Sequence, residues 1–572
     1  MASDQRRTLL WLLLAVVAIT AACGAGLRRF PMREVVWTDP DQATFSPPPQ
    51  EYYSPFGWDA ADHTIFRPIS RFFAVDPAGE AANVNALDEV PNSSWFTNRL
   101  GRYPMTPEEV ERGSCTEPLL APVGTWTVKG AKPDGANPGF MIKAGDGRRY
   151  MVKFDGTLQG ERATSADVLG SRVYHAAGYW SPCNSVVFFE RDILTIDPEA
   201  ESENEKGEKV PLTWDDIDTV LSKAYRLPDG RYRASGSLFL PGRPLGPWKY
   251  QDTRDDDPND VIPHQDRREL RGGYVLASWL NHFDTREQNT LSIWMDAGDE
   301  TGYVRHYYLD FGDCLGSLWD QEGISRRLGH AYYLDIPYLV QDALTLGTLA
   351  RPWEDPQLGE TGHTLGYFTV HRFVPDQYRT GYPNPAFIRA TERDNAWMAR
   401  IIAHFDEARL DAALRPSRVQ EPLVRSEIMR ILMGRRDKLL RRWMSKVSPL
   451  SAPELASAAS GTQLCMRDLA VTGGIAEQAK RAYRAVAYGG DDLAPLPVTE
   501  VQKADADRAC IGLPRVPGAS AGVPGYLIVD LVGTSGPYDT VGPARVHLYD
   551  RGNGHYMIVG LERPDDDTPP ET

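Results

Sequence analysis

Hydrophobic and polar positions alternate in three short stretches that follow one another after residue 124. They cover residues 125–129, 140–142 and 150–154, and turn residues separate them: Pro133 to Gly139 first, then Gly145-Asp146-Gly147. Alternation with a period of two is typical of strands that bury one face, and Gly, Pro and Asn favour tight turns. The pattern therefore predicts an antiparallel meander of three strands.

Apolar residues then recur at helical spacing. Ala166, Leu169, Val173 and Ala176 predict a helix over residues 163–177, which Gly178 ends. Further helices are expected at residues 212–225, 269–280, 391–410 and 421–443, with Thr213 as a cap and Thr391 with Asp394 as a capping box. A hairpin is expected from 290–295 to 303–309, and another around Asn553-Gly554.

This order of elements predicts an α+β chain of several domains, because 572 residues are too many for one core. Residues 24–114 are rich in Pro and aromatics and are expected to form an irregular lead segment that wraps onto the main body. A β-rich region is expected at 115–245, a helical region at 246–449 and a small, mainly β domain at 450–563. The acidic, Pro-rich residues 564–572 are expected to be disordered.

The first 23 residues have the features of a targeting segment. Arg6 and Arg7 precede an apolar run over residues 9–19, which is too short for a comfortable membrane span. Small residues then lead to Cys23, so the segment resembles a bacterial lipoprotein signal. That resemblance implies export, lipidation at Cys23 and a membrane-anchored protein of the bacterial cell envelope. The alternatives are an ordinary cleaved signal and an uncleaved anchor.

Charge and cysteine content indicate which ligands and which disulfide to expect. The formal net charge is −16, and the basic run Arg435-Arg436-Asp437-Lys438 lies in a helical pattern that we interpret as a solvated face. Nucleic-acid binding is therefore not expected, since it needs clustered basic side chains. Five cysteines follow Cys23 and no C-x-x-C is present, so a cysteine-built zinc site is not expected. Export permits disulfides, and Cys465 with Cys510 is the pair that we expect.

Two motifs carry the chemistry. His282, Asp284 and Asn289 form H-x-D-x-x-x-x-N, and Asp310-Phe311-Gly312 follows after the predicted hairpin. Protein kinases present a base and two magnesium ligands in this order. Asp284 is thus the expected base, and Asn289 and Asp310 offer the hard oxygen ligands that Mg²⁺ prefers.

Upstream residues complete the set that phosphoryl transfer requires. Lys153, on the third strand, is expected to hold the phosphates of ATP, and Asp167 on the next helix to fix that lysine, with Glu161 as its competitor. Arg286 is expected to steady the transferred phosphate. The turn from Gly135 to Gly139 is expected to cover the phosphates with backbone N–H groups.

Taken together, residues 120–445 resemble the protein-kinase-like fold, and they are closer to atypical kinases such as bacterial kinase toxins and phosphatidylinositol kinases than to signalling kinases. The resemblance implies a β-rich N-lobe at 115–245 and a helical C-lobe at 246–449. The chain departs from the family pattern at three points. The phosphate turn is not G-x-G-x-x-G, Phe283 replaces the Arg of H-R-D, and no A-P-E follows the D-F-G.

Each motif residue also has a purely structural interpretation. Asp284 would cap a turn, Lys153 would face solvent from a strand, and Asp167 and Glu161 would stabilise a helix N-terminus. The acidic run Asp255 to Asp260 resembles a calcium loop, but Asp260 and Asp266 stand where Gly and Glu are expected. Ion pairs of this run with Arg267, Arg268 and Arg271 are the preferred interpretation.

The sequence therefore predicts an atypical kinase-like phosphotransferase that moves the γ-phosphoryl group of ATP, with Mg²⁺, to an unknown hydroxyl on a protein or small molecule. Two alternatives stay open because ATP is scarce outside the cytoplasm. One is a catalytically inactive kinase-like scaffold or binding lipoprotein, and the other is a metal-dependent envelope hydrolase that uses the same carboxylates.

Overall fold

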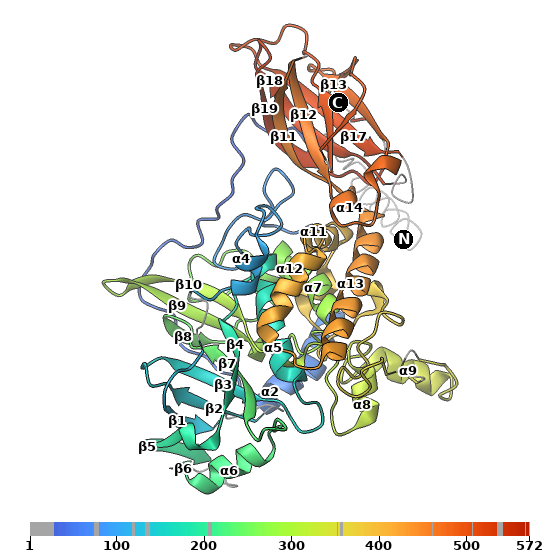
Figure 1. The fold of residues 1–572 in the computed structure, drawn as a ribbon. Coiled ribbons are helices and arrows are strands. Elements are labelled where there is room, and N and C mark those ends of the chain that lie inside the picture. Colours follow the sequence, from blue (N-terminus) through green and yellow to red (C-terminus); the bar gives the residue numbers. More distant parts are fainter. Residues whose placement is uncertain are drawn as a thin grey trace, which may run out of the picture.

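The computed structural model describes residues 28–73, 79–116, 121–131, 138–203, 209–351, 353–354, 358–459, 461–505, 507–534, 541–566 and 568–570. Cys23, Gly135 and the predicted signal lie outside these residues. The chain is α+β, as the sequence predicts, with four sheets and a central group of helices (Figure 1). Among the described helices, none has the length and apolar character needed to cross a membrane.

The largest sheet has seven strands in the order β4-β7-β3-β2-β1-β5-β6. Its strands are β1 Trp126–Ala131, β2 Gly139–Lys143, β3 Arg149–Phe154, β4 Asn184–Phe189, β5 Leu194–Glu203, β6 Lys209–Pro211 and β7 Tyr232–Leu238. The pairs β1–β2 and β2–β3 are antiparallel, so the predicted meander is confirmed. On β3, Tyr150, Val152 and Phe154 point into the core, which leaves Lys153 on the other face.

A second sheet of three strands follows in the chain. It contains β8 Arg243–Gly246, β9 Thr290–Gly298 and β10 Thr301–Tyr308, with β9 in the middle. Strands β9 and β10 are antiparallel, which confirms the predicted hairpin. The register pairs Tyr308 with Thr290, so the hairpin returns the chain to the point where it left the H-x-D segment.

The helices after β3 are α5 Arg162–Ala177, α6 Trp214–Ser222, α7 Arg268–Leu280, α8 Glu322–Arg327, α9 Ile336–Leu344, α10 Pro385–Arg389, α11 Glu392–Ile402, α12 Glu407–Leu414 and α13 Pro422–Met444. Most of them lie in the middle of the molecule, whereas α6 lies next to β5 and β6 and α9 lies at one edge (Figure 1). The predicted cap at Thr213 and the capping box of Thr391 with Asp394 are both confirmed. The apolar faces of α5, α7, α11 and α13 share one buried cluster, which includes Trp279, Trp397 and Trp443.

The interpretation of the basic run in α13 as a solvated face is wrong for two of its residues. Arg435 and Arg436 are buried, at 5% and 4% exposure. Arg435 donates to the carbonyl oxygen of Ser278, and Arg436 donates to the carbonyl oxygen of Phe405. Both guanidinium groups therefore join α13 to neighbouring segments.

The lead segment is less irregular than predicted. Helices α2 Phe56–Ala61 and α3 Arg67–Phe73 are joined through the π-helical turn η1 Asp62–Phe66, and α4 spans Pro107–Arg112. The segment also wraps onto the body, since Phe45 forms a β-bridge with Gly302. Apolar spacing does not predict these helices, because the residues that they bury include the polar Asp59 and His63, whereas the apolar Trp58, Phe66 and Ile69 are exposed.

Residues 450–562 form two antiparallel sheets at one end of the molecule (Figure 1). The first sheet contains β11 Leu450–Ala458, β12 Gly461–Asp468, β15 Gln502–Ala504 and β16 Arg508–Gly512; the second contains β13 Tyr483–Gly489, β14 Ala494–Leu496, β17 Gly525–Gly533, β18 Ala544–Asp550 and β19 Tyr556–Glu562. The short helix α14 Leu469–Thr472 follows β12. These sheets share a separate apolar cluster.

Two disulfides are present among the described residues. Cys465 and Cys510 lie opposite each other on β12 and β16, which confirms the predicted pair. Cys115 and Cys183 form the second, joining the residue just after the lead segment to the residue just before β4. Cys314 is a buried free thiol.

Candidate functional site

The H-x-D segment and the D-F-G turn lie next to each other because of the β9–β10 hairpin. Asp284 and Asn289 lie between α7 and β9, and Asp310 follows β10. The backbone N–H of Leu309 donates to the carbonyl oxygen of Asn289, with 2.9 Å between nitrogen and oxygen. A local hairpin thus brings together two motifs that are separated by twenty residues of chain.

Lys153 and Asp310 form an ion pair, with 2.8 Å between Nζ and Oδ1. Their side chains are 12% and 24% exposed, so the pair is mostly buried but still in contact with solvent. Burial alone would lower the pKa of Lys153, but the carboxylates of Asp310 and Asp167 raise it above its usual range. The lysine on β3 therefore stays charged beside the D-F-G aspartate.

Asp167 and Glu161 lie in different surroundings. Asp167 is buried inside α5, where its Oδ1 accepts a hydrogen bond of 3.2 Å from the backbone N–H of Phe311. Burial raises the pKa of Asp167, and the Lys153 ammonium opposes that shift. Glu161 instead precedes α5 with a φ of 67°, and its Oε2 accepts from the backbone N–H of Gln420. The structure thus brings Asp167, and not Glu161, to the lysine.

Of the turn from Gly135 to Gly139, which is expected to cover the phosphates, the structure describes only residues 138 and 139. Gly139 begins β2 and lies opposite Lys153 in the sheet register. An ideal Cβ at Gly139 would lie 2.4 Å from the carbonyl oxygen of Val152. Glycine is therefore required here by the close approach of β3, and the backbone next to the lysine has no side chain in its way.

Asp284 is held by its own segment. The side-chain amide of Asn289 donates to Oδ2 of Asp284 and to its carbonyl oxygen, both at 2.8 Å. Arg286 Nε lies 3.5 Å from Asp284 Oδ1. Burial and the nearby Asp313 carboxylate raise the pKa of Asp284 to about 7, although Arg286 and Asn289 act in the opposite direction. A carboxylate of this kind is matched to accept a proton near neutral pH.

The D-F-G phenylalanine fixes the position of Asp310. Phe311 is fully buried, and its ring centroid lies 4.8 Å from that of Tyr174 and 5.6 Å from that of His282. Asp310 itself adopts a left-handed conformation with φ of 52°. The turn therefore directs the Asp310 carboxylate towards β3 while its neighbour anchors it in the core.

Asp313 is a site residue that the motif analysis missed. It lies in the 3-10 turn η5 Phe311–Asp313, and its carboxylate acts on the pKa of both Lys153 and Asp284. The one feature of the sequence that could have indicated Asp313 is its position directly after the D-F-G motif. Asp313, Asp310 and the Asn289 amide carry oxygen atoms of the kind that Mg²⁺ or Mn²⁺ takes as ligands. Among the described residues, however, Asp284, Asp310 and Asp313 do not form a group of three acids within 4.8 Å of one another.

Tyr333 was also missed, and it borders the site on the side of Asp284. Burial raises the pKa of Tyr333, and the carboxylates of Asp284 and Asp313 add to that shift. Its ring is stacked on Trp319 at 5.5 Å and packs edge-on against Tyr382 at 5.1 Å. No sequence motif marks these aromatic residues, because separate loops bring them together.

The acidic run expected to pair with arginines does so in part. Arg267 pairs with Asp260 at 3.4 Å, whereas Arg271 pairs with Asp266 at 2.6 Å. Arg268 pairs instead with Asp88 and Asp394. In the part of the chain that the structure describes, the acidic run does not appear among groups of three His, Cys, Asp or Glu close enough to share a metal ion.

No family model matches the sequence, and no curated protein matches it. Among solved structures, the chain is similar to the Golgi casein kinase with Mn/ADP bound, at 11% identity and a TM-score of 0.22, over 50% of this chain and 74% of that one. A second structure of the Golgi casein kinase matches at 11% identity and a TM-score of 0.22, over 49% and 74%. At this level of similarity, a function can be argued only from the residues of the site itself.

Proposed function

We propose that the chain is a kinase-like phosphotransferase that transfers the γ-phosphoryl group of ATP to a hydroxyl group. The observation that carries the proposal is the ion pair of Lys153 with Asp310, next to Asp284 and Asn289. The proposal uses four groups, one on β3 and three between residues 284 and 310: a cation for the phosphates, two oxygen donors for a metal ion and a carboxylate for the acceptor.

In this proposal, residues 115–245 are the N-lobe, residues 246–449 are the C-lobe and residues 450–563 are an additional β domain. Lys153 binds nucleotide phosphates, and Asp310, Asn289 and Asp313 bind the metal ion. Asp167 positions the D-F-G turn through its bond to Phe311. Asp284 accepts the proton of the acceptor hydroxyl, and Arg286 stabilises the charge on the transferred group.

The proposed location is the bacterial cell envelope, with Cys23 as a lipid anchor. Two disulfides support export, since disulfides persist in oxidising compartments. The acceptor is a protein or a small molecule that fits beside Tyr333, Trp319 and Tyr382.

The test is a thermal-shift titration of the detergent-solubilised chain with ATP, with and without Mg²⁺ or Mn²⁺. Binding is expected to raise Tm by a few degrees at ligand concentrations about 100-fold above Kd. Lys153→Ala and Asp310→Ala should abolish the shift. Lys129→Ala is the matched control, because Lys129 on β1 of the same sheet pairs with Asp197 at the surface.

Activity separates the three candidate functions. Transfer of label from [γ-³²P]ATP, lost in Asp284→Asn, is the expected result. Nucleotide binding without turnover would favour a kinase-like scaffold. Hydrolysis of phosphate esters without nucleotide would favour a metal-dependent hydrolase and contradict the proposal.

A further inference from the structure

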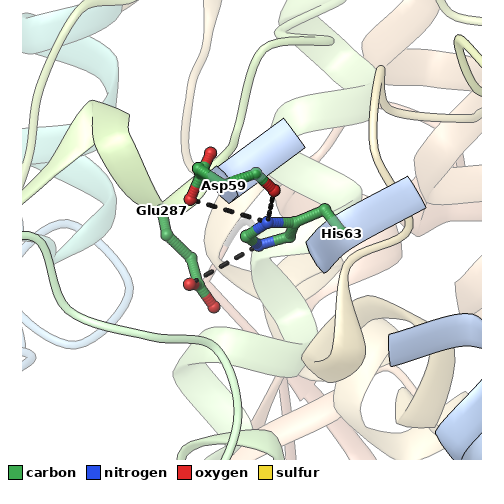
Figure 2. Close-up of side chains that lie close together, drawn as sticks. All are labelled: Asp59, His63 and Glu287. Carbon is green, nitrogen blue, oxygen red and sulfur yellow. Dashed lines mark hydrogen bonds and ion pairs between the residues drawn. The ribbon is translucent and has the colours of Figure 1, made fainter. Parts of the chain in front are cut away.

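A second polar cluster lies where the lead segment meets the H-x-D segment. It consists of Asp59 on α2, His63 on η1 and Glu287 in the 3-10 turn η4 Glu287–Asn289 (Figure 2). One ligand atom from each lies within 4.8 Å of the other two, and among the described residues no other group of three His, Cys, Asp or Glu does so. The cluster is separate from the Lys153–Asp310 pair.

The orientation of His63 leaves one ring nitrogen without a hydrogen-bond partner. Its Nδ1 lies 2.8 Å from the carbonyl oxygen of Asp59, which can only accept, so Nδ1 carries a hydrogen. Its Nε2 is buried, has no hydrogen bond and points at Glu287 Oε2 from 3.5 Å (Figure 2). The side chain is only 4% exposed. A metal-binding histidine typically uses one nitrogen for the metal ion and donates the other to a backbone carbonyl.

The charges around His63 favour a divalent cation. The carboxylates of Asp59, Asp62 and Glu287 face one guanidinium, that of Arg67, which contacts Asp62 and Glu287 at 2.7 and 2.6 Å. Arg286 is nearby but lies 3.5 Å from Asp284. Arg286 also acts on the Asp59 carboxylate, so it is shared between Asp284 and this cluster. With the imidazole neutral, as metal binding requires, the three carboxylates still outnumber the guanidinium groups, and a bound cation balances that excess of negative charge.

The cluster also has room for additional ligands. A cavity of about 90 Å³ is lined by Tyr52, Ser54, Asp59, Asp62, Glu287 and Gln288, among other residues. That volume holds a few water molecules. The cavity reaches Asp59 and Glu287 but is not lined by His63, so water in it can complete the coordination of an ion from the side of the two carboxylates.

We propose that Asp59, His63 and Glu287 bind a divalent transition-metal ion of the Zn²⁺ or Mn²⁺ class. One imidazole nitrogen and two carboxylate oxygens suit these ions, whereas Mg²⁺ and Ca²⁺ prefer oxygen ligands alone. The 3.5 Å between Nε2 and Oε2 fits two ligands about 2.1 Å from a shared ion.

The ion has a specific structural consequence. Glu287 lies between Arg286 and Asn289 in sequence, and its Oε1 accepts from the backbone N–H of Tyr250 at 2.9 Å. An ion bound to Glu287 and to two residues of the lead segment fastens that segment to the loop that carries Asp284 and Asn289. Binding at this site does not depend on the proposed phosphotransferase activity.

The experiment is a titration of the full-length, detergent-solubilised and chelator-treated chain with Co²⁺, without nucleotide. Co²⁺ serves as a spectroscopic substitute for Zn²⁺, and visible absorption reports nitrogen coordination. We expect one nitrogen-ligated ion per chain, and His63→Ala should weaken its binding at least about 100-fold. His555→Ala, which removes an exposed histidine on the β18–β19 hairpin, should leave the titration unchanged.

Two further variants keep the test decisive. Asp310→Ala should retain the Co²⁺ spectrum, because Asp310 belongs to the other site. If His63→Ala does not fold by circular dichroism, Asp59→Asn replaces it, since it keeps the side-chain shape and should weaken binding about 10-fold or more. The proposal is overturned if the wild-type chain gives no Co²⁺ spectrum, or if the spectrum survives both substitutions in the cluster. A protonated His63 that only forms ion pairs would give the first of these results.

Discussion

Gly170 is the residue that lets α5 pass over the D-F-G phenylalanine. An ideal Cβ at this position would lie 2.4 Å from Phe311 Cβ, a distance that side chains do not adopt. Gly170→Ala must therefore displace Phe311, and with it Asp310. We expect it to lower the free energy of unfolding by about 1–3 kcal/mol and to weaken ATP binding.

Gly323 provides the matched control for that substitution. It lies in helix α8, and an ideal Cβ there meets nothing within 4 Å. Gly323→Ala should therefore stabilise the protein by up to about 1 kcal/mol, because alanine favours helical conformation. Equal effects of the two substitutions in chemical denaturation would show that Phe311 does not depend on Gly170.

His306 makes stability depend on pH. Its ring is buried and stacked on Trp95 at 3.5 Å, and burial holds its pKa well below the usual range. The charged and titratable groups that act on it are Asp260, His264, Arg267 and Arg254. A histidine with a lowered pKa contributes stability above its unfolded pKa of about 6.5, and that contribution is lost as pH falls below this value.

As pH falls from 6.5 to 5, the wild-type chain should therefore lose more stability than His306→Gln, with a difference in slope that rises to about 1.4 kcal/mol per pH unit. Denaturation in urea at several pH values measures this difference in slope. Parallel curves for the two proteins would mean that His306 is protonated equally in the folded and unfolded states.

Helix α13 shows how far periodicity can predict an element. The helix and its length follow from its apolar spacing, but the direction of its arginines does not, because guanidinium groups can replace apolar contacts when carbonyl oxygens face them. Arg435 lies 3.8 Å from the ring centroid of Phe373 and donates to Ser278. Burial lowers the pKa of Arg435 to about 9.

Arg435→Ala should lower the free energy of unfolding by about 2–4 kcal/mol, since it leaves a cavity and an unpaired carbonyl oxygen. Arg441→Ala on the same helix should change it by less than about 0.5 kcal/mol, because Arg441 is exposed. Chemical denaturation of the two variants measures the contrast, which a solvated basic face would not produce.

Most elements whose pattern is local were predicted well, although the helix predicted over residues 391–410 is two helices, α11 and α12; most contacts between elements were not predicted. The β1–β3 meander, α5 and the β9–β10 hairpin follow from periodicity and turn residues, and the hairpin alone places Asp310 beside Asn289. The choice between Asp167 and Glu161 needed the start of α5, because a residue before the helix points elsewhere. The helical run Phe56–Phe73 was not predicted, because its buried face carries the polar residues Asp59 and His63. Their burial is explained by contacts with each other and with Glu287, which is far away in the sequence.

Across the whole molecule, Asp88 connects parts that have separate apolar cores. The lead segment supplies Asp88, which pairs with Arg268 of α7, Arg400 of α11 and Arg563 after β19. Arg563 is buried and also donates to the carbonyl oxygens of Ser448 and Leu450. One carboxylate therefore joins the helical core to the C-terminal sheets.

The contribution of Asp88 can be isolated from that of its neighbours with a double-mutant cycle of Asp88→Asn and Arg563→Met. Because Arg563 is buried and Asp88 is only 13% exposed, removing one partner leaves an uncompensated group, and the cycle should give a coupling energy of about 1.5–3 kcal/mol. Arg393 with Asp565, 3.3 Å apart, is the matched control, since it also connects α11 to the chain after β19. Asp565 is 90% exposed, so that pair should give less than about 0.5 kcal/mol.

The positions of the tryptophans allow the unfolding of the residues before 450 to be measured separately from that of the C-terminal sheets. The fourteen tryptophans all precede residue 450, so their fluorescence reports the first part of the chain alone. Hydrogen exchange of peptides from β17 and β18 reports the C-terminal sheets. In Asp88→Asn, these sheets should open at lower denaturant concentration than the tryptophan-containing part, because the ion pairs that couple them are gone. Coincident transitions in the variant would show that apolar contacts, and not Asp88, hold the two parts together.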